Sequence, residues 1–182
     1  MQRRSAFVFA LLLAVVLVPA SARADGFISP YLGMNFGADT TEKSTIYGGA
    51  VGFIGDNGGF ELDFGYTPDF FGEDESPIEG KVVTAMGNIL IGGRRSGFAP
   101  YLAFGAGVIR TSINDDLLDL DAAKNSLGGN VGGGFFIGGG SFTVRGDARY
   151  FRAFDYEGFD DFDFRQDKLS FWRATVGVGL MW

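Results

Sequence analysis

Hydrophobic and polar residues alternate with a period of two along most of the chain, which is the pattern of β-strands. Each alternating segment has about 9–11 residues, the length at which a tilted strand crosses a bilayer. The pattern predicts strands over residues 27–38, 46–55, 59–67, 81–92, 99–110, 126–138, 141–152 and 169–182. After residue 24, only residues 115–124 offer a helical alternative, as one or two turns within a loop. The pattern therefore indicates an all-β fold.

The connections between these segments alternate between short, glycine-rich turns and longer polar loops. The short connections are residues 56–58, 93–98 and 139–140, and the long ones are residues 39–45, 68–80, 111–125 and 153–168. Outer-membrane barrels have short periplasmic turns and longer extracellular loops. We therefore expect an eight-stranded antiparallel up-and-down transmembrane β-barrel, with both termini of the barrel on the side of the short turns.

The two faces of each predicted strand differ in character. The third strand sets Phe60, Leu62, Phe64 and Tyr66 against Glu61, Asp63 and Gly65; the seventh sets Phe142, Val144, Ala148 and Tyr150 against Arg145, Asp147 and Arg149. The interior of an eight-stranded barrel is only wide enough for side chains to fill. We expect the polar and glycine faces to line it and the aromatic faces, which would overfill it, to point into lipid. A soluble barrel would have the opposite arrangement.

The first residues predict export. Arg3 and Arg4 precede an apolar run from Ala6 to Val18, and Ala22-Arg23-Ala24 follows as a small-x-small cleavage site. This order is typical of a Sec signal peptide, and the run is too short for a spanning helix. We assign residues 1–24 to the signal peptide and residues 25–182 to the barrel domain.

Composition excludes several classes of protein. Loss of the three signal-peptide arginines takes the formal charge from −7 to −10, which argues against nucleic acid as a partner. The chain has no Cys and no His, so it contains neither disulfides nor a histidine general base. Clustered carboxylates in the long loops suit Ca²⁺, but none matches an EF-hand loop, and we interpret them as solvated surface. We predict a non-enzyme with no catalytic residue, cofactor or metal.

Six charged residues fall on inward-facing positions. They are Glu61 and Asp63 on the third strand, Arg145, Asp147 and Arg149 on the seventh, and Arg173 on the eighth. The third and seventh strands face each other across an eight-stranded lumen. Because unpaired buried charge is costly, we expect the acids and bases to pair. We interpret them as a structural plug; a narrow or gated ion path through the same charges is the alternative.

The same alternation places four basic residues outward at the loop ends of strands: Lys81, Arg110, Arg152 and Lys168. A lipid-facing Arg or Lys costs roughly 2–4 kcal/mol at mid-bilayer but about 0–1 kcal/mol near the interface. We predict that these residues bind lipopolysaccharide phosphates, with Arg offering bidentate contacts. The alternative is that they are solvated rim charges or partners of loop carboxylates.

Several motifs resemble one known group of proteins: "PYLGMNFG", "GFELDFGYT", "APYLAFGAGV", "GGNVGGGFF" and the terminal "VGVGLMW". In these the chain resembles the small outer-membrane barrels of Gram-negative bacteria, namely the OmpA transmembrane domain, OmpX, OmpW and the opacity-type surface antigens. In that family the last strand, ending in an aromatic residue, is the recognition signal for the barrel-assembly machinery. The resemblance implies the same role for Trp172, Val176, Val178, Leu180 and Trp182.

Together these features predict a non-enzymatic integral outer-membrane protein with a structural or surface-adhesive role. A narrow pore, or an OmpW-like conduit for small or hydrophobic molecules, is the alternative. We expect a monomer whose partners are outer-membrane lipid, lipopolysaccharide and, during insertion, the barrel-assembly machinery.

Overall fold

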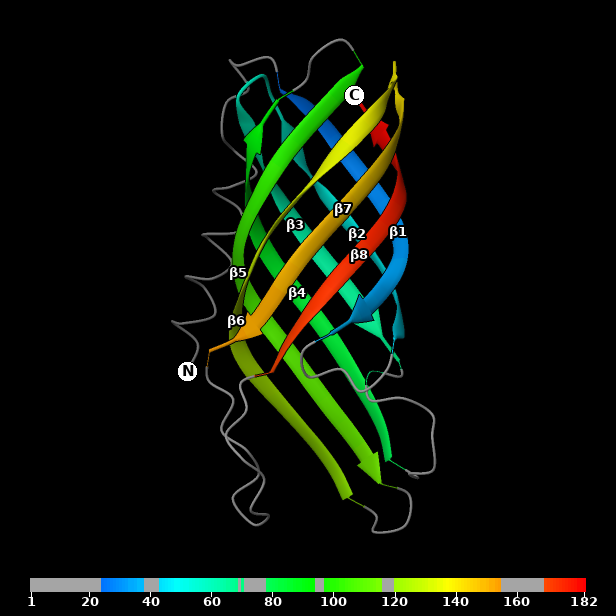
Figure 1. The fold of residues 1–182 in the computed structure, drawn as a ribbon, viewed down its shortest axis with the longest axis vertical. Coiled ribbons are helices and arrows are strands. Elements are labelled where there is room, and N and C mark those ends of the chain that lie inside the picture. The colour runs from blue at the N-terminus through cyan, green and yellow to red at the C-terminus, as the bar shows by residue number, and fades with distance from the viewer. Residues whose placement is uncertain are drawn as a thin grey trace, which may run out of the picture.

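A computed structural model describes residues 24–37, 43–68, 70, 78–93, 97–115, 120–154 and 169–182, and shows one closed barrel (Figure 1). Eight antiparallel strands follow one another in chain order around it. The strands are β1 (Asp25–Phe36), β2 (Ser44–Ile54), β3 (Gly58–Thr67), β4 (Ile78–Gly92), β5 (Phe98–Asp115), β6 (Leu120–Gly139), β7 (Phe142–Ala153) and β8 (Ser170–Met181). The predicted fold class and the eight strands are confirmed. The described part of the chain contains no helix long and apolar enough to cross a membrane.

The barrel has two unlike ends. The turn end carries the short connections, such as the one that Gly140 makes with a positive φ of 67° between β6 and β7. The loop end carries the longer connections that follow β1, β3 and β7, and the β5–β6 connection there shortens to residues 116–119. In Figure 1 the turn end is at the top, and the β5–β6 hairpin and the start of β4 extend furthest at the bottom. The signal-peptide prediction falls on residues 1–24, almost all of which lie outside the described residues.

Strands β5 and β6 are longer than the sequence pattern predicts. Their pairing continues from Arg110↔Asn125 to Asp115↔Leu120, through residues assigned above to a loop. Strand β4 pairs along the same stretch, as far as Ile78↔Asp115. The helical alternative for residues 115–124 is therefore wrong where the chain is described. The ladder of neighbouring strands determines the conformation of a segment whose own apolar pattern is weak.

The first and last strands close the barrel. They pair from Phe27↔Met181 to Phe36↔Trp172. Beyond this ladder, the Gly26 amide donates to the Trp182 carbonyl at 3.0 Å, and the Trp182 amide donates to the Gly26 carbonyl at 3.1 Å. Closure leaves no bare edge between these strands, which is the condition for a sheet to span lipid.

The outer surface is apolar, as the alternation predicts. The exposed residues include Phe64 and Tyr66 on β3, Val144 on β7, Trp172 near the start of β8, and Trp182 directly after β8. Glu61 and Asp63 alternate with these β3 residues and are buried in the lumen. The predicted faces of β3, β7 and β8 are thus the observed ones.

The prediction that aromatic side chains point outward is wrong for a group of rings inside the lumen. These are Phe27, Tyr31, Phe70, Tyr101, Phe136, Phe151 and Phe171, each at most 7% exposed. Glycine makes the room: a Cβ on Gly134 would lie 2.6 Å from the Tyr101 hydroxyl oxygen, and one on Gly48 would lie 2.5 Å from the Tyr31 hydroxyl oxygen. A narrow lumen therefore accepts a large ring wherever a facing strand has no side chain.

Buried apolar residues form two clusters inside the barrel. The first contains Phe27, Tyr31, Ile46, Ala50, Ile54, Leu90, Ala99, Tyr101, Ala103, Phe136 and Met181, and most of it lies toward the turn end. The second contains Phe70, Val82, Met86, Ile109, Phe151, Ala153, Leu169 and Phe171, toward the loop end. We call these the turn-end cluster and the loop-end cluster. The charged residues of β3, β7 and β8 lie between the two clusters, with Arg145 nearer the turn end and Arg173 nearer the loop end.

Candidate functional site

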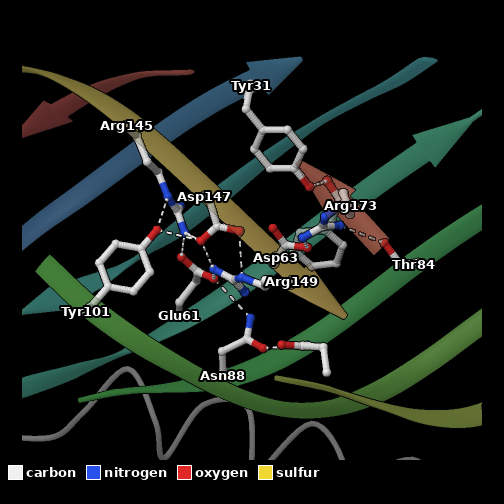
Figure 2. Close-up of polar contacts among 12 residues, drawn as sticks. Tyr31, Glu61, Asp63, Thr84, Asn88, Tyr101, Arg145, Asp147, Arg149 and Arg173 are labelled. Carbon is white, nitrogen blue, oxygen red and sulfur yellow. Dashed lines mark hydrogen bonds and ion pairs between the residues drawn. The ribbon is translucent and has the colours of Figure 1, made fainter. Parts of the chain in front are cut away.

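The six inward charges predicted from the sequence all lie in the lumen, where each is at most 8% exposed. Glu61 and Asp63 come from β3, Arg145, Asp147 and Arg149 from β7, and Arg173 from β8. Strict alternation along each strand puts charges two residues apart on the same inner face. Figure 2 shows these side chains converging on one another across the barrel. We call this group the charged layer.

Glu61 is the centre of the charged layer. Its carboxylate accepts from Arg145 Nη2 at 2.5 Å and lies 2.9 Å from Arg149 Nη2. The Glu61 carboxylate also accepts a hydrogen bond from the Asn88 side-chain amide at 3.0 Å (Figure 2). The Asn130 side-chain amide in turn donates to the Asn88 side-chain oxygen at 2.8 Å. One fully buried carboxylate is therefore neutralised by two guanidinium groups and held by an amide chain from two other strands.

Asp147 joins the two β7 arginines. It lies 2.8 Å from Arg149 and 3.5 Å from Arg145. The Tyr101 hydroxyl donates to the same carboxylate at 2.6 Å and accepts from Arg145 Nε at 2.8 Å. Glu61 and Asp147 thus share the charge of both arginines. The guanidinium of Arg145 also lies over the Phe136 ring, 5.1 Å from its centroid, which is within cation–π range.

Asp63 and Arg173 form a separate pair. Arg173 Nη2 donates to Asp63 at 2.7 Å, and its Nη1 reaches the Thr84 hydroxyl at 3.4 Å. The guanidinium lies over the Phe151 ring, 4.4 Å from the centroid. Arg149 is the direct cross-strand neighbour of Arg173 on β7. Two like charges stand side by side here because Arg173 pairs with Asp63, while Arg149 pairs with Glu61 and Asp147.

The charged layer contains as many acids as bases, three of each, and so has no net formal charge. Each of these three carboxylates pairs with at least one guanidinium. Within the described ranges, no group of three or more acid, His or Cys side chains is placed to hold a metal ion. This arrangement fills the lumen with paired charge.

The other predicted residues lie outside this layer. Arg110 and Arg152 are exposed on the outer face near the loop end, and Lys81 is half-buried on the same face of β4 as Val83. Lys168 lies outside the described residues. Trp172, Val176, Val178, Leu180 and Trp182 form the exposed outer row of β8. The roles assigned to these two sets stay predictions.

Sequence reasoning missed the neutral side chains that surround the charged layer: Tyr31, Thr84, Asn88, Tyr101 and Asn130. Alternation could have identified them, because a residue next to an outward-facing residue on a strand points into the lumen. Asn88 precedes the outward Ile89, and Tyr101 precedes the outward Leu102.

Comparison with known proteins gives a family and a set of similar folds. The family model of the outer membrane protein beta-barrel domain matches residues 8–181. No curated protein matches the chain. Neisserial surface protein A is similar in structure, with 14% identity, a TM-score of 0.62, and coverage of 86% of this chain and 96% of that one.

Two further solved structures are similar over nearly their whole length. The N-terminal β-barrel of Pseudomonas aeruginosa OprF has 19% identity and a TM-score of 0.50, covering 88% of this chain and 98% of that one. Ail, the attachment invasion locus protein of Yersinia pestis, has 14% identity and a TM-score of 0.56, covering 88% and 99%. At such identities these likenesses show the fold, while the family model extends over almost the whole sequence. The chain belongs to the outer membrane protein beta-barrel domain family.

Proposed function

We propose that this protein is a non-enzymatic integral outer-membrane barrel with a closed lumen and a structural or surface-adhesive role. The observation that carries the proposal is the filled interior: a neutral charged layer lies between two apolar clusters. Family membership supports the location. The filled lumen supports a protein that neither conducts solutes nor catalyses a reaction.

A conducting lumen needs a hydrated path, and the described interior offers a poor one. Phe27 and Phe136 pack against each other at 5.1 Å between ring centroids in the turn-end cluster. Phe70 and Phe171 make an edge contact at 5.1 Å in the loop-end cluster. A passing ion would have to displace rings at both levels and break salt bridges between them, at a cost of several kcal/mol per separated buried pair.

A surface role is supported by the loop end. Strands β5 and β6 continue as a paired hairpin past the last β6–β7 pair, Gly128↔Ala153, and past the last β3–β4 pair, Thr67↔Val82. This part of the hairpin stands beyond the barrel wall (Figure 1). Ail, whose structure is similar to this one, was also solved in complex with the heparin analogue sucrose octasulfate. We infer for this chain a contact surface on the projecting hairpin.

The proposal includes export and assembly. Residues 1–24 act as a cleaved signal peptide, and residues 25–182 insert as a monomer with the barrel-assembly machinery. Amino-terminal sequencing of the protein isolated from outer membranes is expected to begin at Asp25. An intact amino terminus on the membrane-inserted protein would contradict the assignment.

Planar-bilayer recording tests the closed lumen. The refolded wild-type protein should insert without producing discrete conductance steps, while a general porin measured in the same bilayers provides the positive control. Insertion is verified separately by the gel shift of the folded, unheated barrel. Regular single-channel steps that scale with the amount of inserted protein would favour the alternative, a narrow pore, and would overturn the closed lumen.

A further inference from the structure

The outer faces of β4, β5 and β7 share one feature at the loop end. On each strand an unbroken outward row of apolar or glycine residues ends in a basic residue. The rows run from Ile91 to Val83 and then Lys81 on β4, from Phe98 to Val108 and then Arg110 on β5, and from Phe142 to Tyr150 and then Arg152 on β7.

The height of the β5 row matches the hydrocarbon core of a membrane, and the β4 and β7 rows are each two residues shorter. From Phe98 to Val108 the strand spans about 34 Å, which is about 26 Å along the barrel axis at a tilt of about 40°. The apolar band of outer-membrane barrels is about 25 Å tall. Arg110 therefore stands just outside the hydrocarbon, at the level of lipid headgroups.

We propose that Lys81, Arg110 and Arg152, called the basic rim from here, bind the phosphates of lipopolysaccharide in the outer leaflet. The inference is independent of whether the lumen is closed and rests on the outer face alone. Lipid-facing cations at this level meet lipid headgroups before they meet any soluble ligand. Phosphate is the headgroup chemistry that Arg recognises through two parallel hydrogen bonds and Lys through a point charge.

The register places two members of the basic rim within reach of one phosphate. Val83 is opposite Arg110, and Lys81 is opposite Ser112. Lys81 and Arg110 are therefore diagonal neighbours on one face, at a separation of about 7–8 Å between strand positions. Asn125, directly opposite Arg110 on β6, adds an exposed polar side chain to the same face.

Arg152 completes an amphipathic surface across β6. It is paired with Gly129, whose lack of a side chain leaves space for the half-exposed ring of Phe154: a Cβ on Gly129 would lie 2.9 Å from that ring. Val131 continues the exposed apolar face of β6 toward the membrane centre, and the exposed Leu127 lies two residues beyond Gly129 toward the loop end. Acyl chains along these apolar rows would bring the phosphates of the same glycolipid to the basic rim.

The test is native mass spectrometry of the whole barrel in detergent, titrated with bisphosphorylated lipid A. The triple variant Lys81→Gln/Arg110→Gln/Arg152→Gln should bind lipid A about tenfold more weakly than wild type, as the loss of three charge contacts at the surface implies. Lys124→Gln is the matched control. Lys124 lies near the same end of β6 but alternates with the outward residues Asn125 and Leu127, so it belongs to the inner face. Its loss should change binding by less than about twofold.

Two further arms distinguish the sources of phosphate. Millimolar inorganic phosphate should not displace lipid A, and lipid A without phosphates should bind wild type and the triple variant equally. The proposal is overturned if the triple variant retains bisphosphorylated lipid A like wild type, or if Lys124→Gln weakens binding as much. Displacement by inorganic phosphate would assign the rim to free phosphate and would likewise refute a lipid site. The gel shift of the unheated barrel confirms that every variant is folded.

Discussion

Replacing Glu61 with Gln removes one charge from the middle of the charged layer without changing the shape of the side chain. Glu61 is fully buried and compensates Arg145 at 2.5 Å and Arg149 at 2.9 Å. In the variant three guanidinium groups remain with two carboxylates, so the lumen carries a net positive charge. Asp147 still faces both β7 arginines, but only at 3.5 Å in the case of Arg145.

The expected loss of stability is large. Removing one partner of a buried ion pair costs about 3–5 kcal/mol, because the other charge is left without compensation. That is a large part of the roughly 5–15 kcal/mol by which a domain is stable. Ser29→Ala is the matched control: Ser29 is equally buried, and its hydroxyl has no hydrogen-bond partner among the described residues. It should change stability by less than about 0.5 kcal/mol.

Urea unfolding in thin phospholipid vesicles measures these differences. Trp172 and Trp182 are the only tryptophans and both face lipid, so their fluorescence reports the loss of the inserted barrel. A double-mutant cycle of Glu61→Gln with Arg145→Met should give a coupling of about 2 kcal/mol or more, since the double variant has two acids and two bases again. The charge-swapped variant Glu61→Arg/Arg145→Glu should regain part of the stability. Coupling below about 0.5 kcal/mol would refute the reasoning that this pair compensates charge.

Two further predictions concern closure and packing. Trp182→Ser should lower the fraction of membrane-inserted, heat-modifiable protein in cells. The Trp182 indole packs so closely over Gly26 of the first strand that a Cβ built on Gly26 would lie 2.8 Å from the ring. Wild-type amounts of the inserted variant would exclude a role of the indole in closure. Gly105→Ala should destabilise the barrel by about 1–3 kcal/mol in the same urea assay, because its Cβ would overlap the Asn88 side chain and break the amide chain to the charged layer. The control Gly87→Ala, whose Cβ would find nothing nearer than 3.7 Å, should cost less than about 1 kcal/mol, and an equal loss in both variants would contradict the packing argument.

Much of the barrel follows from alternation alone. A period of two decides which face of β3, β7 and β8 meets lipid, and the lengths of the connections decide which end carries the turns. Alternation also brings Glu61 and Arg145 to the same lumen, although they are 84 residues apart in sequence. Alternation assigns each residue to one face of its strand, and the character of that face assigns it to the lumen or to lipid. Neither inference requires knowledge of side-chain conformations.

What alternation could not supply is the packing within the lumen. The width of an eight-stranded barrel suggests that rings must face outward, yet Tyr101 fits inside because Gly134 faces it. The length of β5 and β6 was also beyond reach, because the ladder with β4, rather than local hydrophobicity, keeps residues 111–115 extended. Both outcomes depend on cross-strand register, which the pattern of a single strand does not contain.

The ion pairs of the charged layer also bear on the order in which the barrel folds. Each β-hairpin joins residues close in sequence, whereas Arg145 and Glu61 are separated by 84 positions and Arg173 and Asp63 by 110. Contacts of such long range form only after much chain entropy has been lost, so we expect them to appear when β8 joins β1, after the hairpins. Interactions that form after the rate-limiting step slow unfolding and leave the folding rate almost unchanged. The charged layer should therefore govern the lifetime of the closed barrel in the membrane rather than the speed of its insertion, and Glu61→Gln should act mainly on the unfolding rate.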